Sequence, residues 1–323
     1  MYLAPDGDEV EIANAAAGFL ADAMPIDRLH SPNSADMGGE LRQALGEMGW
    51  FALAISEDRG GSGLSAVEHA LFFREVGRQC GPVDALVQAL AANLVQDGEL
   101  RSAIVAGNCG VALIVADGDA FRLIGAQDAT YGLLASPDKA SLFALDGVNA
   151  TDRPALDPAN SLRIVADLPL PVEEASGTRI WQLGQLGTAA MLVGLSEAAL
   201  GLIVEYAKVR EAFGRPIGAY QAVRHPCADM AVCLEAARAQ LWFAATALKE
   251  SRSDAPAHLD AAKHLANEVA MSNSDWNIQL HGGIGVTDEH NAHLLLKHAM
   301  LLTRLFGTKR TLLRQLLNAR LED

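Results

Sequence analysis

Two stretches of the sequence decide the fold: Arg210-Glu211-Ala212-Phe213-Gly214-Arg215-Pro216-Ile217 and Gln279-Leu280-His281-Gly282-Gly283-Ile284-Gly285-Val286. Each follows a long segment with apolar residues at helical spacing, so each is expected at a helix end. Arg210 offers a guanidinium that can make paired hydrogen bonds to a phosphate. Gln279 can hydrogen-bond to a base or ribose edge, and Gly282 and Gly283 let a ligand approach the backbone because they carry no Cβ. The bare chemistry fits either a ligand site or simple helix ends with turns.

The sequence around these stretches is helical from residue 179 to the end. Four long segments carry apolar stripes: Leu183–Glu211, Gln221–Ser251, Ala255–Leu280 and Asp288–Leu321. Four such helices with short links predict an antiparallel four-helix bundle. The most apolar stretch, 189–204, is interrupted by Ser196 and Glu197 and is about 16 residues long. It suits a core helix better than a membrane span.

Two regions with different sequence patterns precede the predicted bundle. Helical patterns occupy residues 1–103, over 9–24, 39–48, 65–80 and 83–97. Residues 104–178 instead hold short apolar runs separated by Asp-Gly, Pro-Asp and Asp-Pro pairs, namely Val111–Ala116, Phe121–Ile124, Tyr131–Ala135, Ser141–Leu145 and Leu162–Ala166. These runs predict strands of a small middle β domain. We therefore expect a mainly α, α+β fold with domains at 1–103, 104–178 and 179–323.

Composition and charge narrow the function. Half of the 323 residues are hydrophobic and 20% are charged, as in a globular protein. The net charge of −15 argues against nucleic-acid binding, which needs a basic surface. Residues 1–178 hold 10 Lys and Arg against 26 Asp and Glu, whereas residues 179–323 hold 15 against 14. A phosphorylated ligand is therefore expected on the C-terminal part.

The cysteines and the N-terminus favour a cytoplasmic protein. No CxxC pair or dense framework occurs among the four cysteines, Cys80, Cys109, Cys227 and Cys233, which is typical of reduced thiols. The chain turns acidic at Asp6 without the basic and apolar regions of a secretory signal. His290 and His293 lie three residues apart, but no carboxylate or Cys pattern completes a ligand set, so we expect no metal site.

A glycine-rich segment matches a dinucleotide-binding pattern at Gly61, Gly63 and Ala66. That pattern needs a strand leading into the glycines, but a polar link, Ser56–Arg59, precedes them and only helices follow. We interpret the segment as a tight turn with Ser65 capping the next helix. A nicotinamide-dependent Rossmann enzyme is therefore disfavoured.

Taken together, the motifs resemble those of the acyl-CoA dehydrogenase family of flavoproteins. That family's RxxFG…Q motif is matched by Arg210, Phe213 and Gln221, and its QxxGGxG…E motif by Gln279, Gly282, Gly283, Gly285 and Glu289. Residues 45–65 resemble part of its first helical domain, with Ser56 where a proline is usual. The resemblance covers most of the chain.

The resemblance implies FAD as the cofactor. In that family the two motifs reach across a subunit interface and hold the pyrophosphate and adenosine end of an FAD whose flavin ring sits mainly in the neighbouring chain. The residues implied to contact FAD here are Arg210, Phe213, Gln221, Gln279, Gly282, Gly283 and Thr308.

The resemblance also implies that the catalytic base is missing. The family removes an α-proton from a CoA thioester while the β-hydride passes to the flavin, and the proton step needs a carboxylate. The usual Glu of an E-G-T turn falls on Phe306, ahead of Gly307 and Thr308. A second position, used by a minority of the family, falls on about Gly184. Neither residue can accept a proton, so we expect no catalytic residue in this chain.

The middle domain departs from the family pattern as well. It looks shortened and lacks the Thr-Glu-Pro-Gly-type loop and Trp-x-Thr segment that cradle the flavin ring. Some bacterial members, notably those acting on steroid side-chain CoA thioesters, are α2β2 heterotetramers in which only one subunit type carries the base. This chain resembles the base-lacking type. That implies a partner subunit, an acyl-CoA substrate and an electron-transfer flavoprotein or similar acceptor.

Two alternatives stay open at this point. One is a self-sufficient homo-oligomeric dehydrogenase with an unrecognised base. The other is a non-catalytic scaffold that keeps the bundle interface without flavin. The intact Arg210 and Gln279 weigh against the scaffold, because a scaffold has no need of them.

Overall fold

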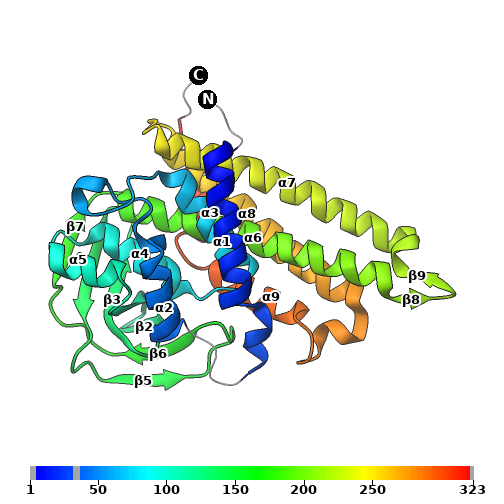
Figure 1. The fold of residues 1–323 in the computed structure, drawn as a ribbon, viewed down its shortest axis with the longest axis horizontal. Coiled ribbons are helices and arrows are strands. Elements are labelled where there is room, and N and C mark those ends of the chain that lie inside the picture. Colours follow the sequence, from blue (N-terminus) through cyan, green and yellow to red (C-terminus); the bar gives the residue numbers. More distant parts are fainter. Residues whose placement is uncertain (1–4, 32–36, 321–323) are drawn as a thin grey trace.

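The computed structural model describes residues 5–31 and 37–320 and has three parts (Figure 1). Short helices form the N-terminal part, a twisted sheet lies in the middle of the chain, and long helices form the C-terminal part. This arrangement confirms the expected mainly α, α+β fold.

The N-terminal part consists of α1 (Gly7–Ala23), α2 (Gly38–Glu47), α3 (Ala66–Arg78), α4 (Val83–Leu94) and α5 (Gly98–Val105), with 3-10 turns η1 (Ile26–His30), η2 (Trp50–Ala52) and η3 (Glu57–Arg59). Ser65 caps α3 as expected: its hydroxyl accepts the Val67 N–H at 3.1 Å, while the Glu68 carboxylate accepts the Ser65 N–H at 2.8 Å. The glycine-rich segment is therefore a turn before a helix. Helix α5 was not predicted.

The middle part is a seven-stranded sheet in the order β5-β6-β2-β1-β3-β4-β7. Its strands are β1 (Gly110–Asp117), β2 (Ala120–Gly125), β3 (Ala129–Ala135), β4 (Lys139–Ala144), β5 (Ala150–Arg153), β6 (Ser161–Val165) and β7 (Glu173–Ser176). β1 and β3 are parallel, and the other neighbours are antiparallel. The five predicted strands are present, and the two that were missed form the sheet edges.

The C-terminal part begins with three long helices, α6 (Arg179–Val209), α7 (Gln221–Lys249) and α8 (Ala255–His281). A hairpin of β8 (Glu211–Ala212) and β9 (Arg215–Pro216), then η4 (Ile217–Ala219), links α6 to α7. After η5 (Gly282–Val286) come two short helices, α9 (Ala292–Leu302) and α10 (Lys309–Leu317). The expected fourth long helix is therefore wrong. The chain breaks where Phe306 and Gly307 adopt φ values of +50° and +123°, which an α-helix cannot contain.

Helix α6 forms the centre of the structure. It is the one described helix that is long and apolar enough to cross a membrane, but 72% of its most apolar window is buried inside the fold. Its glycines allow α3 to pack closely, since a Cβ on Gly194 would lie 1.8 Å from the Arg74 carbonyl oxygen. The apolar stretch is thus a core helix, as expected.

The far ends of α6, α7 and α8 extend beyond the rest of the molecule as an arm (Figure 1). The β8–β9 hairpin forms the tip of this arm. We use the name arm for this end of the three helices with the hairpin and η5.

Candidate functional site

The arm collects six of the seven predicted cofactor residues. Arg210 ends α6, Phe213 lies in the hairpin and Gln221 begins α7, while Gln279, Gly282 and Gly283 lie at the end of α8. The ends of α6 and α8 are in contact, because the rings of Tyr206 and His281 lie 4.5 Å apart. Thr308, the seventh, begins α10 elsewhere in the fold.

The hairpin presents an aromatic ring to solvent. Phe213 is 97% exposed and has a φ of +50°, followed by Gly214 at +79°. The Tyr220 hydroxyl donates to the Ala212 carbonyl at 2.8 Å, and the Arg215 guanidinium lies 4.2 Å from the Tyr220 ring centroid. A fixed hairpin with a bare aromatic tip is typical of a contact site for another protein or a ligand.

The end of α8 offers an open backbone. Gly282 has φ +66° and ψ −143°, a conformation that residues with a Cβ rarely adopt, and no atom lies within 4 Å of a Cβ built there. The preceding His281 is fixed inside the arm: its Nδ1 is 2.7 Å from the Asn277 carbonyl, and its ring lies 4.3 Å from that of His290. Burial lowers the pKa of His281. A rigid helix end thus carries an exposed, Cβ-free loop.

The arm residues fit the phosphate and adenosine end of a dinucleotide. Arg210 is exposed, and among the described residues its guanidinium makes no ion pair. Gln221 and Gln279 are also exposed, so their amides are free to meet a ligand. A fork-shaped cation, two amides and an open glycine backbone are a donor set suited to a nucleotide diphosphate.

The two expected positions for a base pack against each other. Phe306 is 5% exposed, and its ring centroid is 5.5 Å from that of Trp181. A Cβ built on Gly184 would lie 2.2 Å from Cε1 of Phe306. Next to Gly184, the Gln185 amide donates to the Asp260 carboxylate at 2.8 Å. Neither position carries a carboxylate, and Phe306 fills the space at Gly184.

The buried carboxylate of Glu197 in α6 forms ion pairs with three arginines. Glu197 contacts the guanidinium groups of Arg74, Arg78 and Arg238 at 2.5 to 3.1 Å. Burial disfavours its charged form, but the three arginines outweigh this and hold its pKa below the ordinary value. The ionised form of Glu197 is therefore favoured, and this group is poorly suited to accept a proton.

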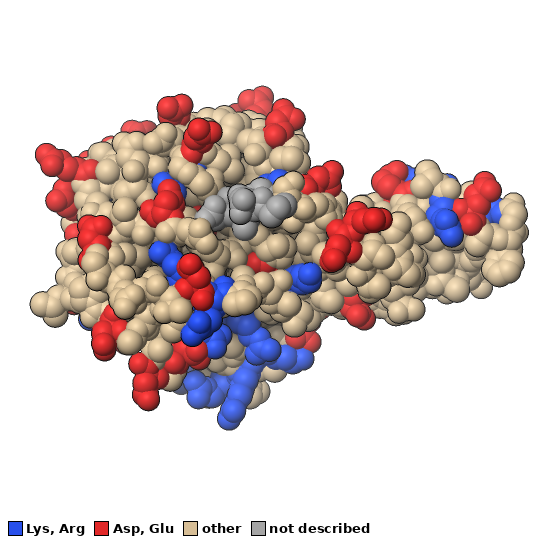
Figure 2. Space-filling model, turned by 90° about the horizontal axis from the view of Figure 1, so that it is seen from below, with Lys and Arg blue, Asp and Glu red and all other residues tan. Residues whose placement is uncertain are grey.

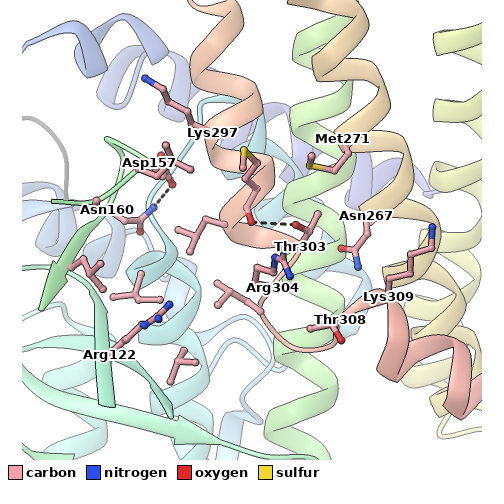
Figure 3. Close-up of a pocket in the computed structure, with 18 of the residues that line it drawn as sticks. Arg122, Asp157, Asn160, Asn267, Met271, Lys297, Thr303, Arg304, Thr308 and Lys309 are labelled. Atoms are coloured by element: carbon pink, nitrogen blue, oxygen red, sulfur yellow. Dashed lines mark hydrogen bonds between the residues drawn. The ribbon is translucent and has the colours of Figure 1, made fainter. Parts of the chain in front are cut away.

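A cavity of about 520 Å³ lies between the sheet and the helices α8, α9 and α10 (Figure 3). Thr308 lines it, together with Asn267 of α8 and Arg304 of the turn after α9. Its two carboxylates are engaged: Asp157 lies 2.8 Å from Nδ1 of His298, and Glu268 accepts from Lys309 at 2.6 Å. Sequence reasoning missed Asn267, although a polar residue at a core-spaced position of a helix is a usable signal.

The surface charge is uneven, as the composition indicates. Acidic residues are scattered over most of the face shown in Figure 2, whereas Lys and Arg form one large group at the bottom of the view, with single ones elsewhere and some on the arm. Four cations line the cavity, Arg122, Lys297, Arg304 and Lys309. Among the described residues, no group of three or more His, Cys, Asp or Glu side chains is placed to hold a metal ion.

Comparison with known proteins finds two family matches and several relatives. Residues 179–321 match the acyl-CoA dehydrogenase C-terminal domain, and residues 6–99 match the acyl-CoA dehydrogenase N-terminal domain. Acyl-CoA dehydrogenase FadE34 of Mycobacterium tuberculosis is 32% identical over 308 residues, covering 88% of this chain but only 43% of FadE34. The chain thus spans less than half the length of that relative. Acyl-CoA dehydrogenase IpdE2 of the same organism is 32% identical over 280 residues, with 84% and 83% covered.

Solved structures share the fold over nearly the whole chain. The Tcur3481–Tcur3483 steroid ACAD variant has a TM-score of 0.78 at 22% identity, covering 96% of this chain and 97% of that one. The ChsE4–ChsE5 complex from Mycobacterium tuberculosis has a TM-score of 0.81 at 22% identity, covering 98% of both. The FAD complex of PigA has a TM-score of 0.81 at 20% identity, also covering 98% of both.

Proposed function

This chain belongs to the acyl-CoA dehydrogenase family, and we propose that it is the base-lacking subunit of a hetero-oligomeric, cytoplasmic, FAD-dependent acyl-CoA dehydrogenase. Membership confirms the resemblance seen in the motifs, and FAD is the cofactor of the family. The proposed reaction is α,β-desaturation of a CoA thioester, in which bound FAD accepts the β-hydride. A partner subunit supplies the base that removes the α-proton.

The packing of Phe306 on Gly184 is the observation that best supports the proposal that this subunit lacks the base. General base catalysis needs a carboxylate within hydrogen-bond reach of the proton. Both positions where the family resemblance places that carboxylate are apolar here, and they occupy each other's space. In the described structure neither position therefore offers a proton acceptor.

The arm supports a role in completing the FAD site of the partner. We assign Arg210 to the pyrophosphate, where a hydrogen bond between charged groups contributes about 1.5–3 kcal/mol. Gln279, Gly282 and Gly283 are assigned to the adenosine side, and Phe213 and Gln221 to the surface that closes over it. Thr308 stays a predicted FAD contact, although it lines the separate 520 Å³ cavity and does not lie on the arm.

The relatives support the partner and the substrate class. More than half of FadE34 lies outside its match to this chain, as expected if a second subunit here supplies what one chain holds there. The ChsE4–ChsE5 structure is a complex of two proteins, and the Tcur3481–Tcur3483 structure is a steroid enzyme. We therefore propose a steroid side-chain CoA thioester as the substrate class and an electron-transfer flavoprotein or similar protein as the acceptor.

The deciding experiment is flavin absorbance of the chain purified alone and co-purified with a family member that carries the Glu of the E-G-T turn. We expect one Arg210-dependent flavin per heterodimer and none on the chain alone. Arg210→Ala should remove it, while Arg310→Ala, an exposed arginine outside the motifs, should not. Stoichiometric flavin and turnover by the chain alone would contradict the proposal, and no flavin in either preparation would favour the scaffold alternative.

One observation favours the self-sufficient alternative, and it concerns Asp260. Burial raises the pKa of this carboxylate, although the Gln185 hydrogen bond opposes the shift, and Gln185 adjoins Gly184. Asp260, however, lines a different cavity of about 390 Å³ near Arg314 and does not line the one that contains Thr308. If Asp260 were the base, Asp260→Asn would abolish turnover by the chain alone. We expect the assembled complex to keep its turnover in this variant.

A further inference from the structure

The exposed loop after α8 is closed by the side chains at its two ends. His281 ends α8 and His290 lies just before α9, so the loop between them is residues 282–289, which we call the glycine loop. The rings of His281 and His290 lie 4.3 Å apart, and the Tyr206 ring of α6 lies 4.5 Å from that of His281. Within the glycine loop Gly285 is buried, and the other residues are exposed. The ring pair therefore joins the start of this exposed loop to its end.

Hydrogen bonds fix where each of the two rings carries its hydrogen. Nδ1 of His281 lies 2.7 Å from the Asn277 carbonyl oxygen, which can only accept, so this nitrogen carries a hydrogen. Nδ1 of His290 accepts the Ala292 N–H at 3.1 Å. Because a backbone N–H can only donate, Nδ1 of His290 carries a lone pair and the ring is neutral. His290 thereby satisfies the first N–H of α9, which has no partner within its own helix.

A further proton has no suitable place on either ring. On His290 it would add to Nδ1 and face the Ala292 N–H, so the hydrogen bond between them would be lost. On His281 it would add to Nε2, which is buried and has no hydrogen-bond partner among the described residues. Burial is the main cause that lowers the pKa of each ring, and the charge of His290 lowers the pKa of His281 further. Acid therefore works against this ring pair.

The groups around the ring pair add to the cost of protonating it. Several titratable and charged side chains surround it: Tyr206 from α6, His30 and Asp27 from η1, His293 and Lys297 from α9, and Asp288 and Glu289 from the glycine loop. Both ring nitrogens of His293 are buried without a hydrogen-bond partner among the described residues. Burial and Lys297 lower the pKa of His293, and Asp288 opposes them without outweighing them. His30 lowers the pKa of His290.

A separate tether holds the start of α9 in place. The Asn291 amide donates from Nδ2 to the Asp27 carboxylate at 2.6 Å, so its Oδ1 accepts from Nε2 of His30 at 2.6 Å. His30 donates from this nitrogen both as a neutral and as a charged ring, so acid leaves this tether intact. Movement caused by protonation of the ring pair should therefore be confined to the glycine loop.

We propose that His281 and His290 form a pH-dependent latch of the glycine loop, closed while both rings are neutral and released when either takes up a proton. Release loosens Gly282 and Gly283, which we assigned to the adenosine side of FAD. This consequence rests on the proposed function, whereas the latch itself is a property of this chain alone. The open loop takes up protons near the ordinary histidine pKa of about 6.5, and the closed loop does so only at lower pH. The latch is therefore closed above pH 6.5, and below it the opening constant rises up to about tenfold per pH unit and per histidine.

Two measurements on the full-length chain test the latch. Nitrogen-15 NMR of histidine-labelled protein distinguishes ring nitrogens with and without hydrogen, and at pH 7.5 we expect hydrogen on Nδ1 of His281 and on Nε2 of His290. Amide hydrogen exchange, corrected for the intrinsic rate, should rise at least about fivefold in the glycine loop and at Ala292 between pH 7.5 and pH 5.5. Amides in the middle of α6 should show no such rise, which separates release of the latch from global unfolding in acid.

Variants at position 290 separate the proton from the hydrogen bond. His290→Asn offers Oδ1 to the Ala292 N–H but does not titrate, so exchange in the glycine loop should stay slow at both pH values. His290→Ala should exchange fast at both, and His225→Gln, at an exposed position of α7, should behave like the wild type. A hydrogen on Nδ1 of His290 at pH 7.5 would overturn the latch. Equal rates at both pH values in the wild type, or an equal rise in His290→Asn, would do the same.

The link to the cofactor is measured separately in the assembled complex. The dissociation constant for FAD should rise at least about fivefold between pH 7.5 and pH 5.5 in the wild type and stay constant in His290→Asn. A pH-independent constant in the wild type, together with pH-dependent exchange in the loop, would overturn the link to FAD and leave the latch standing. A complex without flavin would contradict the proposed function, and hydrogen exchange on the chain alone would still decide the latch.

Discussion

The ring of Phe306 occupies the space in which a side chain at position 184 would lie. A Cβ on Gly184 would be 2.2 Å from Cε1, 2.5 Å from Cδ1 and 2.7 Å from Cζ of this ring. The contact joins α6 to the turn between α9 and α10, and Trp181 packs on the same ring. The residue at each of the two positions therefore limits which side chains fit at the other. A carboxylate side chain at position 184 would require a smaller side chain at position 306.

Gly184→Ala should therefore destabilise the protein. The added methyl group overlaps a buried ring, and overpacking of this kind typically costs about 1–3 kcal/mol. Gly201→Ala on the same helix is the matched control, because no atom lies within 4 Å of its Cβ position and alanine favours the helix. Urea unfolding of both variants measures the difference. A Gly184→Ala midpoint equal to or above that of Gly201→Ala would contradict the packing described, and Phe306→Leu should relieve part of the loss.

The buried His69 should make the protein sensitive to acid. Burial lowers the pKa of His69 to about 3, while its Nε2 lies 3.1 Å from the Leu183 carbonyl. Because the unfolded chain takes up this proton near pH 6.5 and the folded chain does so only near pH 3, stability is retained above pH 6.5 and falls as the pH decreases toward 3. The loss is up to about 1.4 kcal/mol per pH unit.

Denaturant midpoints between pH 7 and pH 4 check this dependence in the wild type and in His69→Gln, which keeps a donor for Leu183. The decline on acidification should be shallower in His69→Gln. His225→Gln, an exposed histidine of α7, should decline like the wild type. If the denaturant midpoint fell equally steeply with decreasing pH in all three proteins, His69 would not be the cause of the loss of stability in acid.

The arginine cluster around Glu197 predicts a large cost for removing its charge. Glu197→Gln leaves Arg74, Arg78 and Arg238 without their shared carboxylate, and breaking a buried ion pair costs about 3–5 kcal/mol. On the same helix, Glu205 forms a pair with Lys208 whose side chains are 71% and 61% exposed. Glu205→Gln should change the free energy of unfolding by less than about 0.5 kcal/mol. Thermal and urea unfolding of the two variants measure this difference. Equal losses of unfolding free energy in Glu197→Gln and Glu205→Gln would contradict the prediction.

Local spacing was enough to place Arg210 and Gln279 at helix ends, but it did not predict the arm or every element around it. Arg210 and Gln279 were assigned to helix ends because the apolar periodicity stops beside them, and the structure places both at the arm. β5 and β7 were missed because their sequences, ATDR and EEAS, have almost no apolar character. They exist as strands only through pairing with β6 and β4 at the sheet edges, and such pairing is not encoded in either segment alone.

The cavity and the broken fourth helix depend on tertiary contacts. Apolar residues continue at helical spacing from α9 into α10, so the sequence pattern hides the turn at Phe306, whose φ of +50° is unusual for an aromatic residue. Lys263 and Asn267 resemble ordinary polar residues of a helix. Their burial becomes visible only when Leu302 and the sheet are placed against α8. The sequence therefore predicted the positions of residues at helix ends and turns. It did not reveal residues whose burial depends on contacts with other helices or with the sheet.

Phe213 should act as an anchor for the partner subunit. Its ring is 97% exposed on a hairpin held by the Tyr220 hydroxyl, and its ring contact within the chain is the edge-on one with Tyr220 at 6.4 Å between centroids. Phe213→Ser therefore removes mainly exposed apolar surface. Aromatic anchors often contribute 2 kcal/mol or more at an interface, so the dissociation constant for the partner should rise at least tenfold, while the melting temperature of the chain alone stays within about 1 °C. Leu170→Ser is the matched control, because Leu170 is 88% exposed between β6 and β7, away from the arm. Sedimentation of each variant with the partner measures its dissociation constant. Equal dissociation constants for Phe213→Ser and Leu170→Ser would show that the hairpin is not part of the interface.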